Sequence, residues 1–489
     1  MPLLPIPNWR ILRSTISTTV LLLSAVSISI AQKQGDRWHF ADGLGLDFSN
    51  GEPVLLTDGA IYRQGLPNHS EASAVICDSA GNLLVYTNSE KIWNRNHDLM
   101  PNGDSLLGHY SSTQGALIVP LPKSKRIFYV FTTDGFYESG LKNGFRYSVV
   151  DMCLNDSLGD VMEGQKNILL LDTVAEKLSA VLHANGRDYW VVAHKFYSDR
   201  FHAYHLTPQG IGDEVISAVG SVHPLGFQGT GSAIGQMKFS PDGTRLAIVN
   251  ANAFPSIAEV CHFNTATGAV TNCISIQANT NFNHYGLSFS PDNTKLYMSC
   301  VLNNNGLYQY DLMAGNAEAI RDSRTTISQV TTYGLQLSNN GKIYLARHNG
   351  YHYIDVIHEP NNLGLACNLE DSAIWLQGRT ISFGLPNFID SYAYTNGLVR
   401  CTDEEPVPDT LTVPTVFTPD GDGINDTFIM EHLPVGSGLV IYSRWGREVF
   451  RTDDYINGWD AGNVTGGVYY YILTLPDGER RNGVVQVLK

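Results

Sequence analysis

The sequence predicts an all-β protein, a seven-bladed β-propeller followed by a small Ig-like β-sandwich. Three observations support this fold class. Only 16% of the 489 residues are charged, whereas 46 are glycine and 24 are tyrosine, a composition that favours turns and strands over helices. The middle of the chain repeats at intervals of about 50 residues. The final part of the chain carries its own set of short strands separated by turn residues.

The repeated unit consists of a strand, a tight turn and a second strand. It occurs at Phe239–Leu246, Phe289–Leu296 and Leu337–Tyr344, with offsets of 50 and 48 residues. Turns built on Pro-Asp-Gly or Asn-Gly supply the positive φ that reverses the chain between two β-rich runs. We therefore predict a β-hairpin at each copy.

A second marker is a glycine that precedes each unit. Its four copies are Gly235, Gly286, Gly334 and Gly384. Glycine inside a strand marks a close backbone approach, as between the innermost strands around a propeller channel. Weaker counterparts are Ser73–Val75, Gly115–Leu117 and Ser179–Val181, which brings the predicted inner strands to seven.

Seven blades fit residues 34–395. The alternative is a β-sandwich with chance turn repeats, but sandwiches show turn signals every ~8 to 12 residues without a longer period. We expect ring closure to join Leu44–Phe48 with the last strands near Asn387–Tyr394.

Residues 1–31 have the pattern of a secretory signal peptide. Arg10 and Arg13 precede the apolar run Val20–Ile30, and we expect cleavage between Ala31 and Gln32. The alternative is a membrane anchor, but the run is shorter than the ~20 residues that span a bilayer. No later segment is long and apolar enough to span, so we expect no transmembrane helix in the mature chain.

The formal net charge of −15 excludes nucleic acid as an expected partner, because phosphate binding needs a basic face. The sequence contains no His-Glu-x-x-His, Walker A or Gly-x-Ser-x-Gly pattern. Gly229–Gly235 resembles a dinucleotide loop, but its third glycine is one place late and it leads into a strand. The histidine pairs His202/His205 and His348/His352 do not converge on strands. We therefore predict no catalytic or cofactor-binding residue in the body.

The chain has seven cysteines, so at least one must be unpaired or bonded elsewhere. Cys261 and Cys273 flank Thr265–Gly268, and a hairpin there would place the two thiols across adjacent strands. We predict a disulfide between them, with two buried free thiols as the alternative. The other five cysteines give no pairing argument.

The acidic, proline-containing stretch Cys401–Thr410 suits an exposed linker. We therefore divide the chain into a propeller at 34–395, a linker at 396–411 and a C-terminal domain at 412–489. The C-terminal domain carries five sequence blocks: Val413–Phe428, Leu439–Gly446, Gly458–Asp460, Gly466–Tyr471 and Asn482–Lys489. Short alternating strands between Gly, Asp and Asn turns indicate an Ig-like sandwich.

In the order and wording of these blocks, the tail resembles the gliding motility-associated C-terminal domain, the type B sorting signal of the type IX secretion system of Bacteroidetes. The family usually has Asn where this chain has Asp420 and Ser443. The resemblance implies export in two steps, through the inner membrane by the signal peptide and through the outer membrane by the type IX secretion machinery. It places the protein at the cell surface or outside the cell.

The body also resembles a propeller-like, WD40-like family common among secreted proteins of Bacteroidetes. The segments that carry this resemblance are Trp38–Phe40, Trp93–His97, Ser111–Gln114 and Gly384–Phe388. The resemblance implies the fold and assigns no reaction.

Asp420, Asp422 and Asp426 bring three carboxylates onto a glycine-bent loop. Hard oxygen ligands on a tight turn suit Ca²⁺, so these residues are candidate calcium ligands. The alternative is a hydrogen-bonded Asx turn that needs no ion.

Arg444, Trp445, Gly446 and Trp459 form the candidate sorting motif. They predict a recognition surface for the secretion machinery. The alternative places the tryptophans in the core, with the arginine packed on a ring.

These observations favour a binding platform for an unknown extracellular ligand, either a glycan or a protein. One alternative is a secreted hydrolase or lyase that uses acidic side chains from different blades. Another is an adhesin or gliding-associated surface component. Exposed aromatic side chains on loops would favour carbohydrate binding or adhesion, and a central cluster of perturbed titratable groups would favour catalysis.

Overall fold

The computed structural model describes residues 33–61, 71–223, 233–251, 256–276, 283–301, 305–347, 350–399, 401, 411–420, 425–430, 433–434, 436–476 and 478–489. The predicted signal peptide, residues 1–31, lies outside this range. The chain divides into two compact units, Met1–Cys401 (the body) and Thr402–Lys489 (the C-terminal unit). Among the described residues, none of the helices has the length and apolar character needed to cross a membrane.

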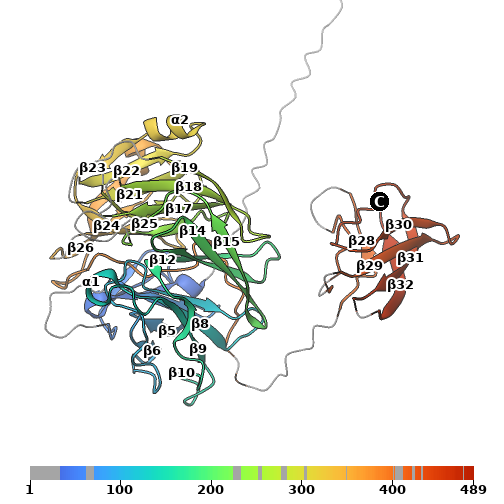
Figure 1. The fold of residues 1–489 in the computed structure, drawn as a ribbon, viewed down its shortest axis with the longest axis horizontal. Helices are drawn as coiled ribbons and strands as arrows, with labels where there is room; N and C mark the ends of the chain where they lie inside the picture. The colour runs from blue at the N-terminus through green and yellow to red at the C-terminus, as the bar shows by residue number, and fades with distance from the viewer. Residues whose placement is uncertain are drawn as a thin grey trace, which may run out of the picture. The chain divides into compact units, whose positions relative to one another are not determined.

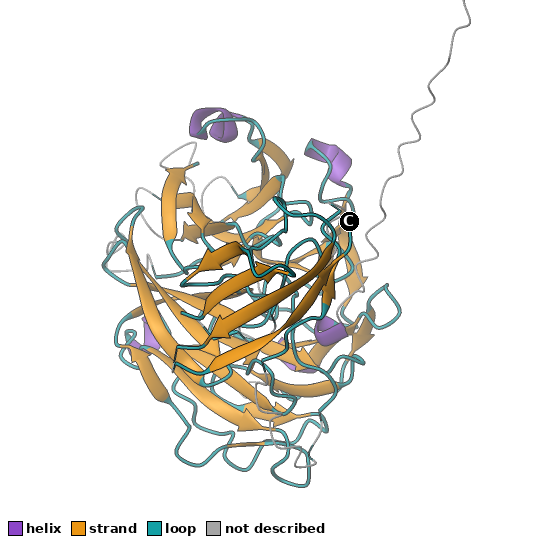
Figure 2. Ribbon diagram, turned by 90° about the vertical axis from the view of Figure 1, so that its right-hand side faces the viewer, coloured by secondary structure: helices purple, strands orange, loops and turns teal. Residues whose placement is uncertain are grey.

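The described residues of the body form seven antiparallel sheets (Figures 1 and 2). In chain order these sheets contain β1 (Arg37–Phe40), β2 (Leu44–Asp47) and β3 (Val54–Leu56); β4 (Ala74–Cys77), β5 (Leu83–Thr87) and β6 (Ile92–Asn94); β7 (Ala116–Pro120), β8 (Ile127–Thr133), β9 (Phe145–Asp151), β10 (Asp160–Val161) and β11 (Ile168–Leu171); β12 (Val174–Leu182), β13 (Tyr189–Lys195), β14 (Arg200–Thr207) and β15 (Gly210–Ala218); β16 (Met237–Phe239), β17 (Arg245–Asn250), β18 (Ile257–Phe263) and β19 (Val270–Ser275); β20 (His284–Phe289), β21 (Lys295–Cys300), β22 (Gly306–Asp311) and β23 (Thr325–Ser328); and β24 (Thr332–Leu337), β25 (Ile343–Arg347), β26 (Tyr353–Ile357) and β27 (Leu369–Trp375).

Helices are few and short in the described residues (Figure 2). They are α1 (Phe136–Ser139), α2 (Ala317–Asp322) and the 3₁₀ turns Lys33–Gly35, Ala41–Gly43 and Gly364–Cys367. The prediction of an all-β protein is confirmed.

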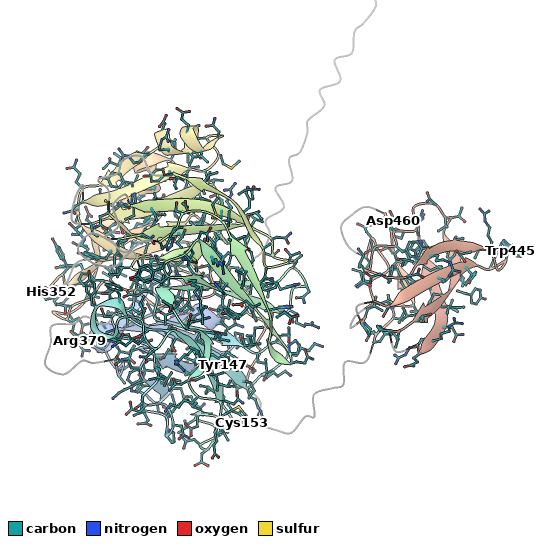
Figure 3. The ribbon with its side chains drawn as sticks, in the orientation of Figure 1. Tyr147, Cys153, His352, Arg379, Trp445 and Asp460 are labelled. Atoms are coloured by element: carbon teal, nitrogen blue, oxygen red, sulfur yellow. A yellow bond between two sulfur atoms is a disulfide. The ribbon has the colours of Figure 1, made fainter. Side chains whose placement is uncertain are left out.

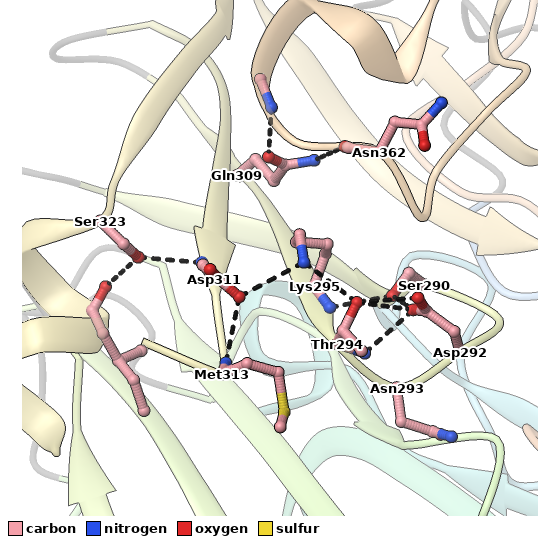
Figure 4. A network of polar contacts seen from close by, with 12 residues as sticks. Ser290, Asp292, Asn293, Thr294, Lys295, Gln309, Asp311, Met313, Ser323 and Asn362 are labelled. Carbon is pink, nitrogen blue, oxygen red and sulfur yellow. Dashed lines mark hydrogen bonds and ion pairs between the residues drawn. The ribbon is translucent and has the colours of Figure 1, made fainter. Parts of the chain in front are cut away.

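The turn repeat joins the first two strands of three sheets: β16–β17, β20–β21 and β24–β25. In the second copy, the Asp292 carboxylate accepts hydrogen bonds from Ser290 Oγ at 2.6 Å and from the backbone N–H of Thr294 at 3.0 Å (Figure 4). Asn293 has φ +63°, the left-handed value that Asn tolerates. Lys295, in β21, then reaches Asp311 of β22 at 3.3 Å. The recurring residues therefore close the turn and fix the hairpin register.

The predicted inner-strand glycines lie where neighbouring backbones come close. A Cβ at Gly286 would lie 2.0 Å from the carbonyl oxygen of Tyr333, and one at Gly384 would lie 2.0 Å from that of Glu71. Any larger residue would therefore push two innermost segments apart.

The predicted pairing that closes the ring is wrong. Leu44–Asp47 forms β2, which pairs with β1 and β3, because the 3₁₀ turn after β1 reverses the chain locally. Among the described residues near 387–394, Asn387 makes a single parallel bridge to Ala74 at the start of β4. The first and last described parts of the body are nevertheless in contact, because the ring centroids of Trp38 in β1 and Phe388 are 5.6 Å apart.

A buried set of polar side chains, here called the polar hub, joins the innermost strands. It consists of Gln114, Lys238, Gln336, Asn387 and Asp390, all buried. The Asn387 amide donates to backbone carbonyls at β7 and β12 (3.2 and 3.1 Å) and accepts from Lys238 Nζ at 3.0 Å. Lys238 also contacts Gln336 at 2.8 Å and Asp390 at 3.2 Å. One segment near the end of the body thus holds several sheets together.

The structure contains two disulfides, and all seven cysteines lie within the described residues. Cys261 and Cys273 are joined across β18 and β19. Cys153, labelled in Figure 3, is joined to Cys401, 248 residues later. The remaining three, Cys77, Cys300 and Cys367, are buried and form no disulfide bond.

The described residues of the C-terminal unit form one five-stranded sheet. The strands are β28 (Val416–Phe417), β29 (Gly438–Ser443), β30 (Glu448–Thr452), β31 (Gly467–Thr474) and β32 (Arg480–Val487), in the order β28-β32-β31-β29-β30. β28 pairs in parallel with β32, and the other pairs are antiparallel. This unit has its own core, centred on Phe428, Leu439, Trp459 and Tyr471.

Candidate functional site at the leading end of the innermost strands

In an antiparallel sheet, the connection between the second and third strands lies at the same end as the start of the first strand. We call this the leading end of the body. In the third sheet it carries α1, between β8 and β9, and in the fourth sheet it carries the turn between β13 and β14. These connections are placed around the starts of the innermost strands, where loops carry side chains that can reach a ligand.

Two carboxylates from different sheets lie at the leading end. Glu71, just before β4, accepts a hydrogen bond from the Tyr285 hydroxyl of β20. Glu176 of β12 accepts from the backbone N–H of Phe136 at 2.6 Å, and from the N–H and Oγ1 of Thr113 at 3.1 and 3.2 Å. Five separate segments of the chain therefore meet at these two side chains.

Burial perturbs the titration of this cluster. Desolvation raises the pKa of Glu176 to about 7, and desolvation followed by the Glu176 charge raises the pKa of Glu71 well above its ordinary value. Beside them, Lys177 is fully buried and donates to Val249 O at 2.8 Å and Asn250 Oδ1 at 2.6 Å. Desolvation lowers its pKa to about 7.

The geometry of Glu176 favours an anchoring role. A general acid needs an oxygen within hydrogen-bond reach of a substrate. Both oxygens of Glu176 instead accept internal donors, which tie α1 and the segment before β7 to β12. Burial therefore accounts for the raised pKa of Glu176, and the hydrogen bonds from Phe136 and Thr113 act against that rise.

A stacked pair of buried histidines lies under the β13–β14 turn. The rings of His194 and His223 are 3.7 Å apart, and the backbone N–H of His223 donates to Ser198 O in that turn. Desolvation lowers the pKa of both histidines well below the ordinary value. Both rings are therefore neutral at pH 7.

Of the histidine pairs considered from the sequence, only His202 and His205 are both described, and these two are not brought together as a metal site. His202 contacts Glu214 at 2.6 Å, whereas the His205 ring stacks 4.6 Å from Trp190. His348 lies outside the described residues, and His352 contacts the carbonyl oxygen of Arg379 at 2.9 Å. Within the described ranges, no group of three or more His, Cys, Asp or Glu side chains could hold a metal ion.

Sequence reasoning missed two exposed tyrosines at the leading end. Tyr137 in α1 is 57% exposed, and Tyr197 in the β13–β14 turn is 52% exposed. Each follows a phenylalanine, Phe136 or Phe196, that packs inward. The signal in the sequence was this Phe-Tyr pair, which recurs 60 residues later at the equivalent connection of the next sheet.

The candidate calcium ligands are only partly described. Asp420 and Asp426 flank a loop that the backbone hydrogen bond from Thr418 N to Asn425 O, 3.0 Å long, closes. Asp422 lies outside the described residues, so calcium binding by this set stays a prediction.

The structure separates the members of the candidate sorting motif. Trp445 is 79% exposed at the tip of the β29–β30 hairpin (Figure 3), and the Arg444 guanidinium lies 4.3 Å from its ring centroid. Gly446 has φ +76° and closes the hairpin turn with Ser443 at 2.9 Å. Trp459, in contrast, is 5% exposed and packs against Phe417 and Phe428 in the core. Arg444 and Trp445 are thus available to a partner, and Trp459 supports the fold.

Solved structures similar to this chain include propeller-like proteins. A putative 6-phosphogluconolactonase from Bacteroides uniformis is 14% identical, with 71% of this chain and 96% of that chain covered and a TM-score of 0.45. A second putative 6-phosphogluconolactonase, from Bacteroides fragilis, is 12% identical, with 70% and 92% covered and a TM-score of 0.44. The β-propeller domain of Cps50 (Swd1) from Myceliophteria thermophila is 11% identical, with 76% and 96% covered and a TM-score of 0.32. At these identities the likeness concerns the fold alone. No curated protein matches the chain.

Residues 411–487 match the family model of the CHU_C type IX secretion signal domain. The match covers all five strands of the C-terminal unit and the exposed hairpin tip with Trp445. It confirms the resemblance of the tail to a type IX sorting signal and the expected location of the protein. The C-terminal unit is a type IX secretion signal domain, and the chain that carries it is exported to the cell surface or beyond.

Proposed function

We propose that this protein is an extracellular or cell-surface binding protein, in which a seven-bladed β-propeller binds an external ligand and the C-terminal unit directs export through the type IX secretion machinery. The main support for this proposal is the independent fold of the signal domain. The signal domain forms a compact unit with its own core, distinct in the chain from the body. A separately folded tail can be recognised by the machinery while the body keeps its own structure.

The seven-bladed arrangement is supported by backbone hydrogen bonds between successive innermost segments. They run from Gln114 to Glu176, Glu176 to Ala233, Gln236 to Tyr285, Gly334 to Phe383, and Asn387 to Ser73. In this proposal residues 383–388 form the innermost segment of the seventh blade, and β1, β2 and β3 are its outer strands. The first and last parts of the body then close the ring together, which removes open sheet edges. The Ig-like sandwich of the C-terminal unit stays part of the proposal.

Binding is favoured over catalysis by the side chains at the leading end. Glu176 is held by internal donors, and Lys177 and the stacked histidines are buried. The side chains that face solvent there include Tyr137 and Tyr197. Exposed aromatic rings on loops are typical of binding surfaces.

The test compares the full chain with a chain that lacks residues 411–489, both with the N-terminal segment intact. The body is followed by an antibody in periplasmic, outer-membrane and medium fractions and by protease treatment of whole cells. We expect the full chain outside and the shortened chain in the periplasm. A Met313→Ala variant, altered at one exposed side chain of the body, controls for a general effect of mutation. If the shortened body still reaches the outside, the proposal is refuted.

A further inference from the structure

The Phe-Tyr pair at the leading end has the same arrangement in two consecutive sheets. Phe136-Tyr137 lies between β8 and β9, and Phe196-Tyr197 lies between β13 and β14. In both pairs the phenylalanine packs inward and the tyrosine is more than half exposed. The repetition places two outward tyrosine rings on neighbouring loops of one surface, here called the tyrosine pair surface (Tyr137 and Tyr197).

The base of this surface is packed and anchored. The rings of Phe136 and Phe196 meet edge to face at 5.9 Å, and the cluster is completed by Leu141, Ala175 and Ala233. The backbone N–H of Phe136 donates to the buried Glu176 carboxylate at 2.6 Å. Two loops from different sheets are thus fixed relative to each other before any ligand binds, which lowers the entropic cost of binding.

Tyr197 is held in a conformation that few residues adopt. Its φ is +58°, in the left-handed region, which costs a non-glycine residue about 1 kcal/mol or more. The Phe196 ring, 4.1 Å from the Tyr197 ring, and the hydrogen bond from Phe196 N to Thr173 O hold this turn. A strained turn that presents an exposed aromatic ring points to a surface selected for contact.

Polar groups beside the rings suit hydroxyl groups. Lys195 immediately precedes Phe196, and its Nζ lies 3.2 Å from the exposed carboxylate of Asp172. This pair, whose Lys195 lies two residues before Tyr197 in the chain, offers both a donor and acceptors. Sugars have the matching chemistry, since their C–H faces stack on aromatic rings and their hydroxyls both donate and accept hydrogen bonds.

The negative charge of the chain favours neutral over acidic carbohydrates as ligands. The chain has a net charge of −15, the Asp134 carboxylate lies beside Gly135 just before Phe136, and the charge of Lys195 is balanced by Asp172. An anionic polysaccharide would be repelled by this net negative charge. A neutral chain of sugars would meet no such penalty.

We propose that the tyrosine pair surface binds a neutral carbohydrate, with Tyr137 and Tyr197 stacking on sugar rings and the Lys195–Asp172 pair contacting hydroxyl groups. This inference rests on the proposed function as a binding protein and names its ligand class.

The test uses the purified full-length mature chain in native gels that contain a soluble neutral glucan, mannan, xylan or galactan, and in parallel gels that contain alginate as the acidic probe. The variant combines Tyr137→Ala with Tyr197→Asn, because Asn tolerates positive φ. The matched control is Tyr470→Ala, which removes a tyrosine that is 49% exposed in the other unit. Circular dichroism and the guanidinium unfolding midpoint show whether each variant is folded.

We expect at least one neutral polysaccharide to retard the wild type and the Tyr470→Ala control equally, and the double variant to bind at least tenfold more weakly. Retardation by none of the neutral polysaccharides, or by alginate alone, overturns the inference. Unchanged binding by a folded double variant also overturns it. Because the assay uses purified protein, it can fail while the export test succeeds, so the two proposals are tested separately.

Discussion

The two disulfides should differ in how much they stabilise the body. In the chain-entropy account a disulfide acts by restricting the unfolded chain, and its effect grows with the length of the closed loop. Cys153 and Cys401 are 248 residues apart, which gives about 5.5 kcal/mol, whereas the separation of 12 residues between Cys261 and Cys273 gives about 3 kcal/mol. Replacing Cys153 and Cys401 with serine should therefore cost about 2.5 kcal/mol more than removing the short-loop bridge.

The assay is guanidinium unfolding of the purified mature chain, followed by circular dichroism. The variants are Cys153→Ser with Cys401→Ser and, for comparison, Cys261→Ala with Cys273→Ala, since Cys261 is buried in an apolar cluster. In the presence of a reductant, the free energy of unfolding of wild type should fall by nearly the sum of the losses in the two variants. If the long-loop variant loses less free energy of unfolding than the short-loop variant, the reasoning from loop length is wrong.

Three further predictions concern single residues. The pKa of the Glu176 carboxyl is about 7 in the folded chain and 4.5 ordinarily, so as the pH rises this carboxyl loses its proton more readily in the unfolded chain. The free energy of unfolding of wild type, relative to Glu176→Gln, should therefore fall by about 3 kcal/mol between pH 4.5 and 7. A difference between the two proteins that does not change with pH in urea unfolding would contradict this. Asn387→Leu leaves partners in the polar hub unsatisfied and should lower the free energy of unfolding by at least about 3 kcal/mol; a loss under about 1 kcal/mol would show that the hub is not required. Trp459→Ala should destabilise the signal domain by about 3–5 kcal/mol in calorimetry, because this side chain is buried. Trp445→Ala should leave the stability of the domain nearly unchanged and should reduce export, because this side chain is exposed. A larger loss of stability in Trp445→Ala than in Trp459→Ala would refute the assignment of these two residues.

Local sequence patterns were sufficient for the strand pairs and for the closest backbone contacts. The Ser-Pro-Asp turns are recognisable because Asp292 closes its own turn through residues two positions away on either side. The spacing of Gly286, Gly334 and Gly384 located the innermost segments, since a side chain there would collide with the next backbone. Both signals lie within a few residues of the contact that explains them.

Contacts between distant parts of the chain were not predictable in the same way. The bridge from Cys153 to Cys401 spans 248 residues, and no local turn relates the two thiols. The polar hub depends on Asn387, a polar residue that has no counterpart in the other repeats. The expected pairing of Leu44–Phe48 with the end of the body was wrong because β2 pairs with β1 and β3, its neighbours in the sequence. Nothing in the sequence distinguishes Glu176 from the other acidic residues, which number 47 in all, because its hydrogen-bond partners Phe136 and Thr113 come from distant parts of the chain.

Transplantation of the C-terminal unit tests directly whether this unit alone directs export. Residues 402–489 are fused to a periplasmic reporter enzyme that carries its own signal peptide, and reporter activity is measured in intact cells and in the medium of a strain with the type IX secretion system. We expect reporter activity at the cell surface or in the medium, and none there when the secretion system is deleted. Activity that stays in the periplasm with the unit attached would show that the C-terminal unit does not direct export.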